Sequence, residues 1–146
     1  MDRTNEAQVR EFALTAVGGF MPPGESPAAQ FVELSIACVR HPRTTCIIAR
    51  LSDGRAAGAG SLEVHSEICA LFGLSVLPEY RRRGLQQAMI AWRMNAAAER
   101  GAKVATIGSK PGIPTERNVR RMGFSVAYTQ PVLVRPGAGL VPVAHA

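Results

Sequence analysis

The chain has 146 residues, 47% hydrophobic and 19% charged, a composition that excludes a disordered tail, a collagen-like repeat and a coiled coil. No apolar run reaches the roughly 18 residues of a membrane span, and the polar start lacks the apolar core of a secretory signal. Seventeen Lys and Arg against eleven Asp and Glu give a net charge of +6. An excess of arginine favours an anionic partner, either a phosphorylated small molecule or nucleic acid.

The length predicts a single domain over residues 1–146, with 136–146 as a tail rich in Pro and Gly. Cys38, Cys46 and Cys69 form no Cys-x-x-Cys pair, and with three histidines they assemble no zinc-ligand spacing. We therefore expect three buried, reduced thiols, no metal, and a cytoplasmic location.

The N-terminal third of the chain is predicted to be mostly helical. Apolar residues at helical spacing indicate a helix over 7–17, which two glycines end. Residues 21–27 are rich in Pro and predict a loop. The stretch from about 27 to 39 fits a second helix, although apolar residues at every second position from 32 to 38 fit a strand nearly as well.

Three strands are predicted next, joined by turns into an antiparallel meander. The β-branched, apolar stretch 44–51, an Asp-Gly turn and the return strand 56–65 form a hairpin. Gly58 and Gly60 in the return strand indicate a bulge or a close approach of another backbone segment. Residues 68–77 are almost continuously apolar, which predicts a central strand buried on both faces.

Helices and strands alternate in the second half. A loop over 78–84 precedes an amphipathic helix over 85–100. A short strand over 104–108, a short helix over 115–122 and a long final strand over 124–135 follow. The order predicts an α/β fold with a mixed central sheet, in which an antiparallel meander continues as βαβαβ and helices flank the sheet.

The most specific chemical signal lies where the strand 68–77 gives way to the helix that begins at residue 85. Arg81, Arg82, Arg83 and Gly84 stand between them. The first amides of a helix have no internal acceptor and carry the positive end of its dipole, so they form an anion site. Gly84 lets the main chain approach a phosphate closely. An isolated Arg-Arg-Arg-Gly, however, is more typical of a solvated basic turn before a surface helix.

Two motifs, one at residues 76–86 and one at residues 115–124, resemble those of the GCN5-related N-acetyltransferase (GNAT) superfamily. Residues 81–86 are similar to its (Gln/Arg)-x-x-Gly-x-(Gly/Ala) pattern, and residues 76–81 are similar to the Val-x-Pro-x-Tyr-Arg that often precedes it. Downstream, residues 115–124 resemble the family's Ser/Thr-x-x-Asn segment and the Gly-Phe pair after it. The resemblance covers residues 44–135 and matches the predicted order of elements.

The resemblance implies that acetyl-CoA binds in a cleft between the family's fourth and fifth strands, here 68–77 and 104–108. Main-chain groups of the fourth strand would pair with the pantetheine arm, and an amide near Leu74 would polarise the thioester carbonyl. The amides of 82–87 would hold the pyrophosphate, and an amine would attack the thioester directly, without a covalent enzyme intermediate. The implied cofactor-binding residues are Leu74, Ser75, Val76, Arg81, Arg82, Arg83, Gly84, Leu85, Gln86, Gln87 and Asn118.

Three features depart from the family pattern. Gln86 stands where Gly or Ala is usual, so its side chain has to point away from the phosphates. Val119 stands where many members have a general-acid tyrosine. Only about six polar residues precede the first predicted helix, so the family's first strand is missing, shortened or contributed elsewhere.

Candidates for proton transfer are few. Tyr128 on the predicted final strand offers a hydroxyl to the leaving thiolate, although a half-buried strand aromatic is its more ordinary interpretation. Glu67, at the start of the strand 68–77, matches a carboxylate of some members. Glu63 and His65 lie across the turn from it, and bulk water is the alternative for both proton transfers.

These observations predict an acetyl-CoA-dependent N-acetyltransferase that acts on an amine-bearing small molecule or peptide. The alternative is a non-catalytic acyl-CoA-binding or regulatory module with the same fold. A nucleic-acid binder is a weaker alternative, because the sequence has no helix-turn-helix, finger or aromatic stacking motif. No membrane partner is expected, and the sequence is compatible with a homodimer.

Overall fold

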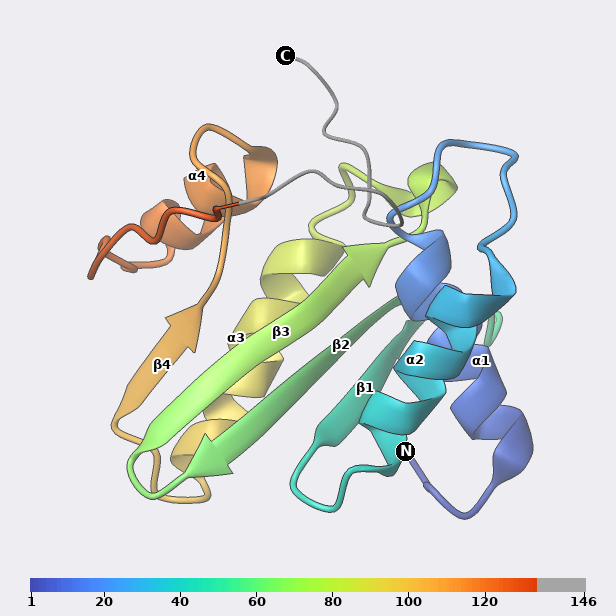
Figure 1. Cartoon of the computed structure of the whole chain (residues 1–146), viewed down its shortest axis with the longest axis horizontal. Helices are drawn as coiled ribbons and strands as arrows, with labels where there is room; N and C mark the ends of the chain where they lie inside the picture. Colours follow the sequence, from blue (N-terminus) through green and yellow to red (C-terminus); the bar gives the residue numbers. More distant parts are fainter. Residues whose placement is uncertain (134–146) are drawn as a thin grey trace.

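A four-stranded mixed sheet organises residues 1–133, the part of the chain that the computed structural model describes (Figure 1). Its strands, in spatial order, are β1 (Thr45–Arg50), β2 (Ala56–His65), β3 (Ile68–Val76) and β4 (Val104–Ile107). The first three are antiparallel neighbours, and β4 lies parallel to β3. A parallel pair needs a crossover connection, which α3 (Leu85–Ala98) provides.

Helices cover the two faces of the sheet. The remaining elements are α1 (Glu6–Gly18), α2 (Ala29–Arg40), the short 3-10 helix η1 (Pro78–Tyr80) and α4 (Pro114–Arg121). α1 and α2 lie on one face, and α3 lies on the other (Figure 1). Each side has an apolar cluster: Val9, Phe12, Val39 and Cys46 belong to the first, and Leu62, Leu71, Ile90 and Val119 to the second.

The predicted mixed α/β fold is confirmed, and most element bounds lie within two residues of those expected. The segment that fitted a helix or a strand is the helix α2. The loop expected over 78–84 contains η1. Among the described residues, no helix is long and apolar enough to cross a membrane.

The expected final strand is the largest error of the sequence-based prediction. Residues 124–133 form no strand, and residues 134–135 lie outside the described part of the chain. Alternating apolar residues favour a strand, but a strand forms only when its main chain pairs with a neighbour. Here the chain leaves α4 at Gly123 without pairing with β4, so Val126 and Tyr128 are exposed.

Burial on both faces was expected for β3, and this expectation is wrong. Ile68 and Phe72 are exposed, whereas Cys69 and Leu71 are buried under α3. α1 reaches β3 only near its end, where Ser75 donates a hydrogen bond to Ala16 O. Within residues 1–133, one face of the first half of β3 is therefore uncovered.

The expectation of three buried thiols is corrected at one position. Cys46 and Cys69 are buried, and burial raises the pKa of both thiols. Cys38 is exposed on α2. Helical spacing places Cys38 on one face of α2 with Phe31 and Leu34, and this face is exposed, whereas Val32 and Val39 are buried.

A β-bulge interrupts the pairing of β2 with β3, as the glycines of β2 indicated. Ala59 pairs with Ser75, and Ser61 pairs with Phe72, so Gly73 and Leu74 face Gly60 alone. Gly73 has the positive φ of 60°. The extra residue bends β3 and changes the direction of its main chain just before the strand ends.

Candidate active site

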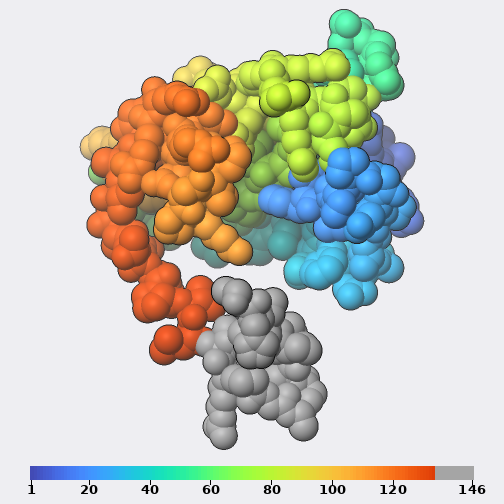
Figure 2. All heavy atoms as spheres, turned by 90° about the horizontal axis from the view of Figure 1, so that it is seen from above, coloured from blue at the N-terminus to red at the C-terminus, as the bar shows by residue number. Residues whose placement is uncertain are grey.

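A hollow opens where β3 and β4 separate. The two strands pair only from Ile68 with Val104 to Leu71 with Ile107. Within the described chain, residues 72–76 of β3 therefore have no strand partner on their β4 side. Seen from above, the hollow lies between α4, in orange, and the connection from α1 to α2, in blue (Figure 2). An extended ligand can pair with this free edge of β3 as an additional strand.

The segment 82–87, which we call the amide loop, continues from the end of β3 into α3. Among residues 1–133, none of its six main-chain amides donates a hydrogen bond to a protein acceptor. Arg82 and Gly84 have positive φ values of 61° and 77°. Such turns direct successive N–H groups toward one point, and the dipole of α3 adds positive potential. The amide loop therefore has the geometry and the positive potential that can hold a phosphate group.

The three arginines have different environments. Arg81 donates hydrogen bonds to Val76 O at 3.3 Å and to Gly19 O at 3.0 Å, so it joins the end of β3 to the end of α1. The Arg83 guanidinium lies 5.6 Å from the ring centre of Tyr80, within the range of a cation–π contact. Arg82 is exposed. The resemblance implied a cofactor-binding role for all three, with unequal contributions because only one or two side chains can reach the phosphates. The structure ties the Arg81 side chain to main-chain carbonyls.

Arg81→Ala should lower the free energy of unfolding by about 1 to 3 kcal/mol, because it removes two charged hydrogen bonds that link α1 to β3. Arg82→Ala should leave stability unchanged and should weaken CoA binding modestly, with a smaller dependence on salt. Urea unfolding and calorimetric titration with CoA at two salt concentrations measure both quantities. An Arg81→Ala variant with unaltered stability would contradict the structural role of this side chain.

Gln86 points away from the amide loop, as its departure from the family pattern required. Its Nε2 donates to Thr115 Oγ1 at 3.0 Å, and its Oε1 accepts a hydrogen bond from Asn118. The Gln86 side chain thus joins α4 to α3 by hydrogen bonds. Its main-chain N–H has no acceptor within residues 1–133 and remains available at the amide loop. Asn118, which the resemblance directs at the pantetheine arm, already uses one of its N–H groups on Gln86. No feature of the sequence indicated this pairing.

The three β3 residues expected to bind pantetheine are at the free edge. Leu74 follows the bulge at Gly73, and Ser75 and Val76 pair with β2 on the other side. The Ser75 side chain is buried and donates to Ala16 O at 2.8 Å, so it is turned toward α1. The Ser75 side chain is therefore already engaged within the protein.

The structure does not bring the expected acid and base to this hollow. Glu67 lies in the turn before β3 and is ion-paired with Lys103. Leu74 is seven residues further along β3, which corresponds to about 20 Å. Tyr128 is 78% exposed. Val119 is buried in the cluster under α3, so the usual position of the general acid is filled by a core side chain.

The other carboxylates near the turn before β3 are also engaged elsewhere. Glu63 accepts a hydrogen bond from Thr44 and lies 3.4 Å from Nδ1 of His41. Two carboxylates that the sequence did not single out, Glu25 and Glu79, line a hollow of about 570 Å³ between the α1–α2 connection and η1. Glu25 lies in the Pro-rich loop 21–27, and Glu79 lies in the short helix η1, so neither local pattern marked them.

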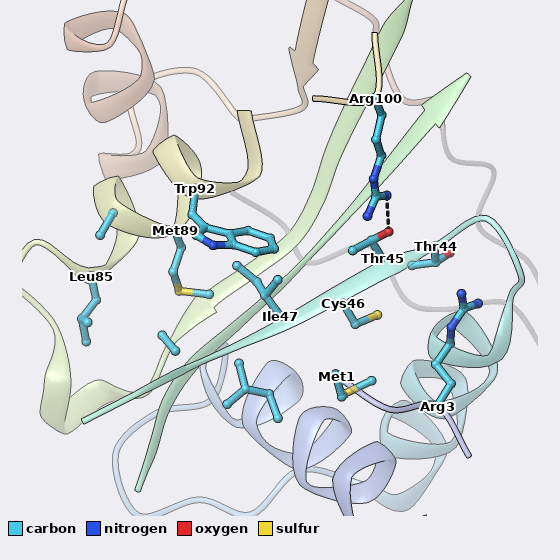
Figure 3. Close-up of a pocket in the computed structure, with 13 residues that line it drawn as sticks. Met1, Arg3, Thr44, Thr45, Cys46, Ile47, Leu85, Met89, Trp92 and Arg100 are labelled. Atoms are coloured by element: carbon cyan, nitrogen blue, oxygen red, sulfur yellow. Dashed lines mark hydrogen bonds between the residues drawn. The ribbon is translucent and has the colours of Figure 1, made fainter. Parts of the chain in front are cut away.

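A separate groove of about 750 Å³ runs between β1 and α3 (Figure 3). Ile47 of β1 and Leu85, Met89 and Trp92 of α3 form its apolar part, and Trp92 is half exposed. Residues 1–5 form no strand, and the outer edge of β1 is unpaired within the described residues. The groove borders the sheet edge opposite to β4, and it is distinct from the hollow between β3 and β4.

The free edge of β3 and the amide loop define the class of this protein. Together they can hold an elongated ligand whose arm pairs with a strand and whose phosphates bind at a helix N-terminus, as in acyl-CoA-dependent transferases. The model of the acetyltransferase (GNAT) family matches residues 11–124, and the chain belongs to this family. The family match makes it an acetyltransferase of the GNAT type, and a solved acetyltransferase that shares its fold contains CoA.

Solved structures of known proteins share this fold at low sequence identity. The aminoglycoside acetyltransferase AAC(6')-Iy, in complex with a bisubstrate analogue, is 18% identical with a TM-score of 0.68, over 90% of this chain and 94% of that one. A ribosomal-protein-alanine N-acetyltransferase from Brucella melitensis biovar Abortus 2308 is 17% identical with a TM-score of 0.65, over 88% and 94%. A transcriptional regulator from Bacillus halodurans C-125 is 12% identical with a TM-score of 0.69, over 90% and 95%. No curated protein matches the chain in sequence.

Proposed function

We propose that this chain transfers the acetyl group of acetyl-CoA to the amine of a small molecule or peptide by direct attack. The observation that carries the proposal is the run of six amides at 82–87 that have no acceptor within residues 1–133, which follows the free edge 72–76 of β3 after η1. The amides bind the pyrophosphate, and the free edge pairs with the pantetheine arm. This order directs the thioester toward the bulge, where the Leu74 amide donates a hydrogen bond to its carbonyl oxygen.

The acceptor approaches from the side of the α1–α2 connection. Glu25 and Glu79 line the hollow beside the end of β3, and their negative charges favour a protonated amine. Attack requires the neutral amine, so the proton leaves to water or to one of these carboxylates. The similar structures include enzymes named for aminoglycosides and for a ribosomal protein, both of which carry amines. These names support an amine-bearing acceptor as a class, and they do not identify the particular acceptor of this chain.

Binding of CoA tests the proposal most directly. Calorimetric titration should show one site per chain, and ligand at one hundred times its Kd should add about 2.7 kcal/mol of stability, or roughly 5–10 °C in Tm. Pantetheine, which lacks the phosphates, should bind far more weakly because it cannot reach the amide loop. If CoA does not bind at millimolar concentration, the proposal is wrong. CoA binding without turnover across a broad amine panel would instead support the non-catalytic acyl-CoA-binding module.

Tyr128→Phe should retain nearly full activity with any amine of the panel that supports turnover. Tyr128 is 78% exposed and does not lie on a strand that could direct its hydroxyl at the sulfur. A thiol has a pKa of about 8.5, so the CoA thiolate can leave unprotonated or take a proton from water. Steady-state kcat and KM for acetyl-CoA measure the effect. A hundredfold loss in kcat would identify Tyr128 as the acid.

A further inference from the structure

Arg93 is a fully buried arginine on α3, with 0% of its surface exposed. Its Nε donates to Met89 O at 3.2 Å, and its Nη1 donates to Ser61 O at 2.8 Å and to Phe72 O at 3.2 Å. Its Nη2 has no acceptor among the described residues. Burial of a guanidinium is costly unless its charge and N–H groups are used. The contacts of Arg93 therefore indicate a role that an apolar side chain could not fill.

Two of these contacts lie at the β-bulge. Ser61 and Phe72 form the pair at which the register of β2 and β3 shifts, directly beside Gly73 and Leu74. A bulge leaves main-chain groups without their ladder partners, and such groups need another hydrogen bond when buried. One nitrogen of Arg93 supplies a donor to both strands at this point. It thereby holds β2 and β3 together where the regular ladder does not.

Gly60 makes room for this arrangement. A Cβ atom at Gly60 would lie 3.4 Å from Nη1 and 3.5 Å from Cζ of Arg93, and 3.3 Å from Leu74 Cδ1. The glycine of β2 thus admits the planar guanidinium between α3 and the bulge. A lysine lacks the planar fork, so it cannot keep the contact with Met89 O and also join both strands.

The buried group stays positively charged at neutral pH. Burial lowers the pKa of Arg93 to about 10. All its hydrogen bonds go to main-chain carbonyls, so no carboxylate neutralises it by direct contact in the described part of the chain. A charge held this way strengthens its hydrogen bonds to Ser61 O and Phe72 O.

We propose that Arg93 is a positioning residue for acetyl transfer: its clamp on Ser61 O and Phe72 O sets the bulge and so directs the Leu74 amide at the thioester carbonyl. The inference rests on the proposed function, because it assumes that the thioester lies at the bulge. Arg93 itself does not touch the reacting atoms. It acts through the main chain of β3.

The carbonyl stretch of bound [1-13C]acetyl-CoA, measured by isotope-edited infrared spectroscopy, tests the inference. A hydrogen bond from Leu74 lowers this frequency relative to acetyl-CoA in water. In Arg93→Met and Arg93→Lys, the carbonyl frequency should rise most of the way back to that of acetyl-CoA in water. Gly60→Ala, which crowds the guanidinium, should raise the frequency by a smaller amount. Ile90→Val is the matched control, because Ile90 is equally buried on α3 but belongs to the apolar cluster. It should keep the parent frequency.

Affinity and turnover separate positioning from a loss of folding. CoA binding should change by no more than about twofold in the Arg93 variants, because the amide loop is untouched. With an amine that the parent acetylates, kcat should fall by about a hundredfold while KM for acetyl-CoA is retained. Should Arg93→Met not fold, Arg93→Lys and Gly60→Ala provide the same comparison.

The outcomes distinguish the inference from the function on which it rests. If the parent shows a lowered carbonyl frequency and the Arg93 and Gly60 variants keep it, the inference is wrong and the proposed function stands. If the parent binds acetyl-CoA with the carbonyl frequency found in water, the inference is wrong and binding and turnover decide the proposed function. If the parent binds no acetyl-CoA, both are wrong.

Discussion

Gly84→Val should abolish detectable CoA binding and leave the circular dichroism spectrum close to that of the parent. Gly84 has φ of 77° and ends the loop before α3. A β-branched residue is strained there by about 1 to 2 kcal/mol, and the loop relieves the strain by rotating its amides away from one another. Losing two charge-assisted hydrogen bonds of about 1.5 kcal/mol each corresponds to at least a hundredfold loss of affinity. Calorimetric titration with CoA measures it.

Gly54→Val is the matched control for this variant. Gly54 has φ of 87°, and, like Gly84, it has no atom within 4 Å of the position that a Cβ would take. It lies in the turn between β1 and β2, away from the amide loop. Both variants should therefore lose similar stability, but only Gly84→Val should lose CoA binding. Equal affinity of Gly84→Val and the parent would show that the amide loop does not bind the pyrophosphate.

Gly19→Ala should destabilise the protein by about 3 kcal/mol or more, the upper end for overpacking in a core. A Cβ at Gly19 would overlap Oγ and Cβ of Ser75 and lie 3.1 Å from Val76 N. The end of α1 would have to lift from β3, which breaks the hydrogen bond from Ser75 to Ala16. Urea unfolding of the variant and the parent measures the difference.

Ser75→Gly should rescue part of this loss in the double variant, because the two atoms that overlap the new Cβ belong to Ser75. Gly18→Ala is the adjacent control: its Cβ would meet only Leu77 Cδ2, at 3.3 Å, which can move. That variant should be neutral or gain up to about 1 kcal/mol from helix propensity. A Gly19→Ala variant as stable as the parent would show that α1 does not pack on β3 as described.

Local sequence patterns were sufficient to predict structure wherever a residue's conformation depends mainly on its neighbours in the chain. The Asp-Gly turn predicted the β1–β2 hairpin, and the apolar spacing of 85–100 predicted α3. Gly58 and Gly60 indicated a bulge or a close approach of another backbone segment, and the structure shows a bulge at Gly73 and Leu74 of β3, opposite Gly60. The strand, basic loop and helix at 76–87 led to the family and to the candidate phosphate site, since a helix N-terminus is an anion site wherever it occurs.

Long-range pairing decided the rest. Residues 124–133 have a strand-like pattern but no strand, because alternation does not specify a partner for the main chain. Glu67 precedes β3 and Leu74 lies near the end of that strand, so the two residues lie about 20 Å apart. Arg81 and Arg82 are adjacent in sequence, but only the packing of α1 against β3 gives Arg81 the carbonyl of Gly19 to bind.

The sequence by itself therefore determined the class of fold, the family and the position of the amide loop. The tertiary structure alone showed that Gln86 joins α4 to α3, and that the buried charge of Arg93 meets the bulge between β2 and β3. Both contacts join residues about thirty positions apart, Gln86 to Thr115 and Arg93 to Ser61. Contacts at such separations depend on how whole elements pack, and a polar side chain on a helix carries no local signal of the carbonyl it will bind.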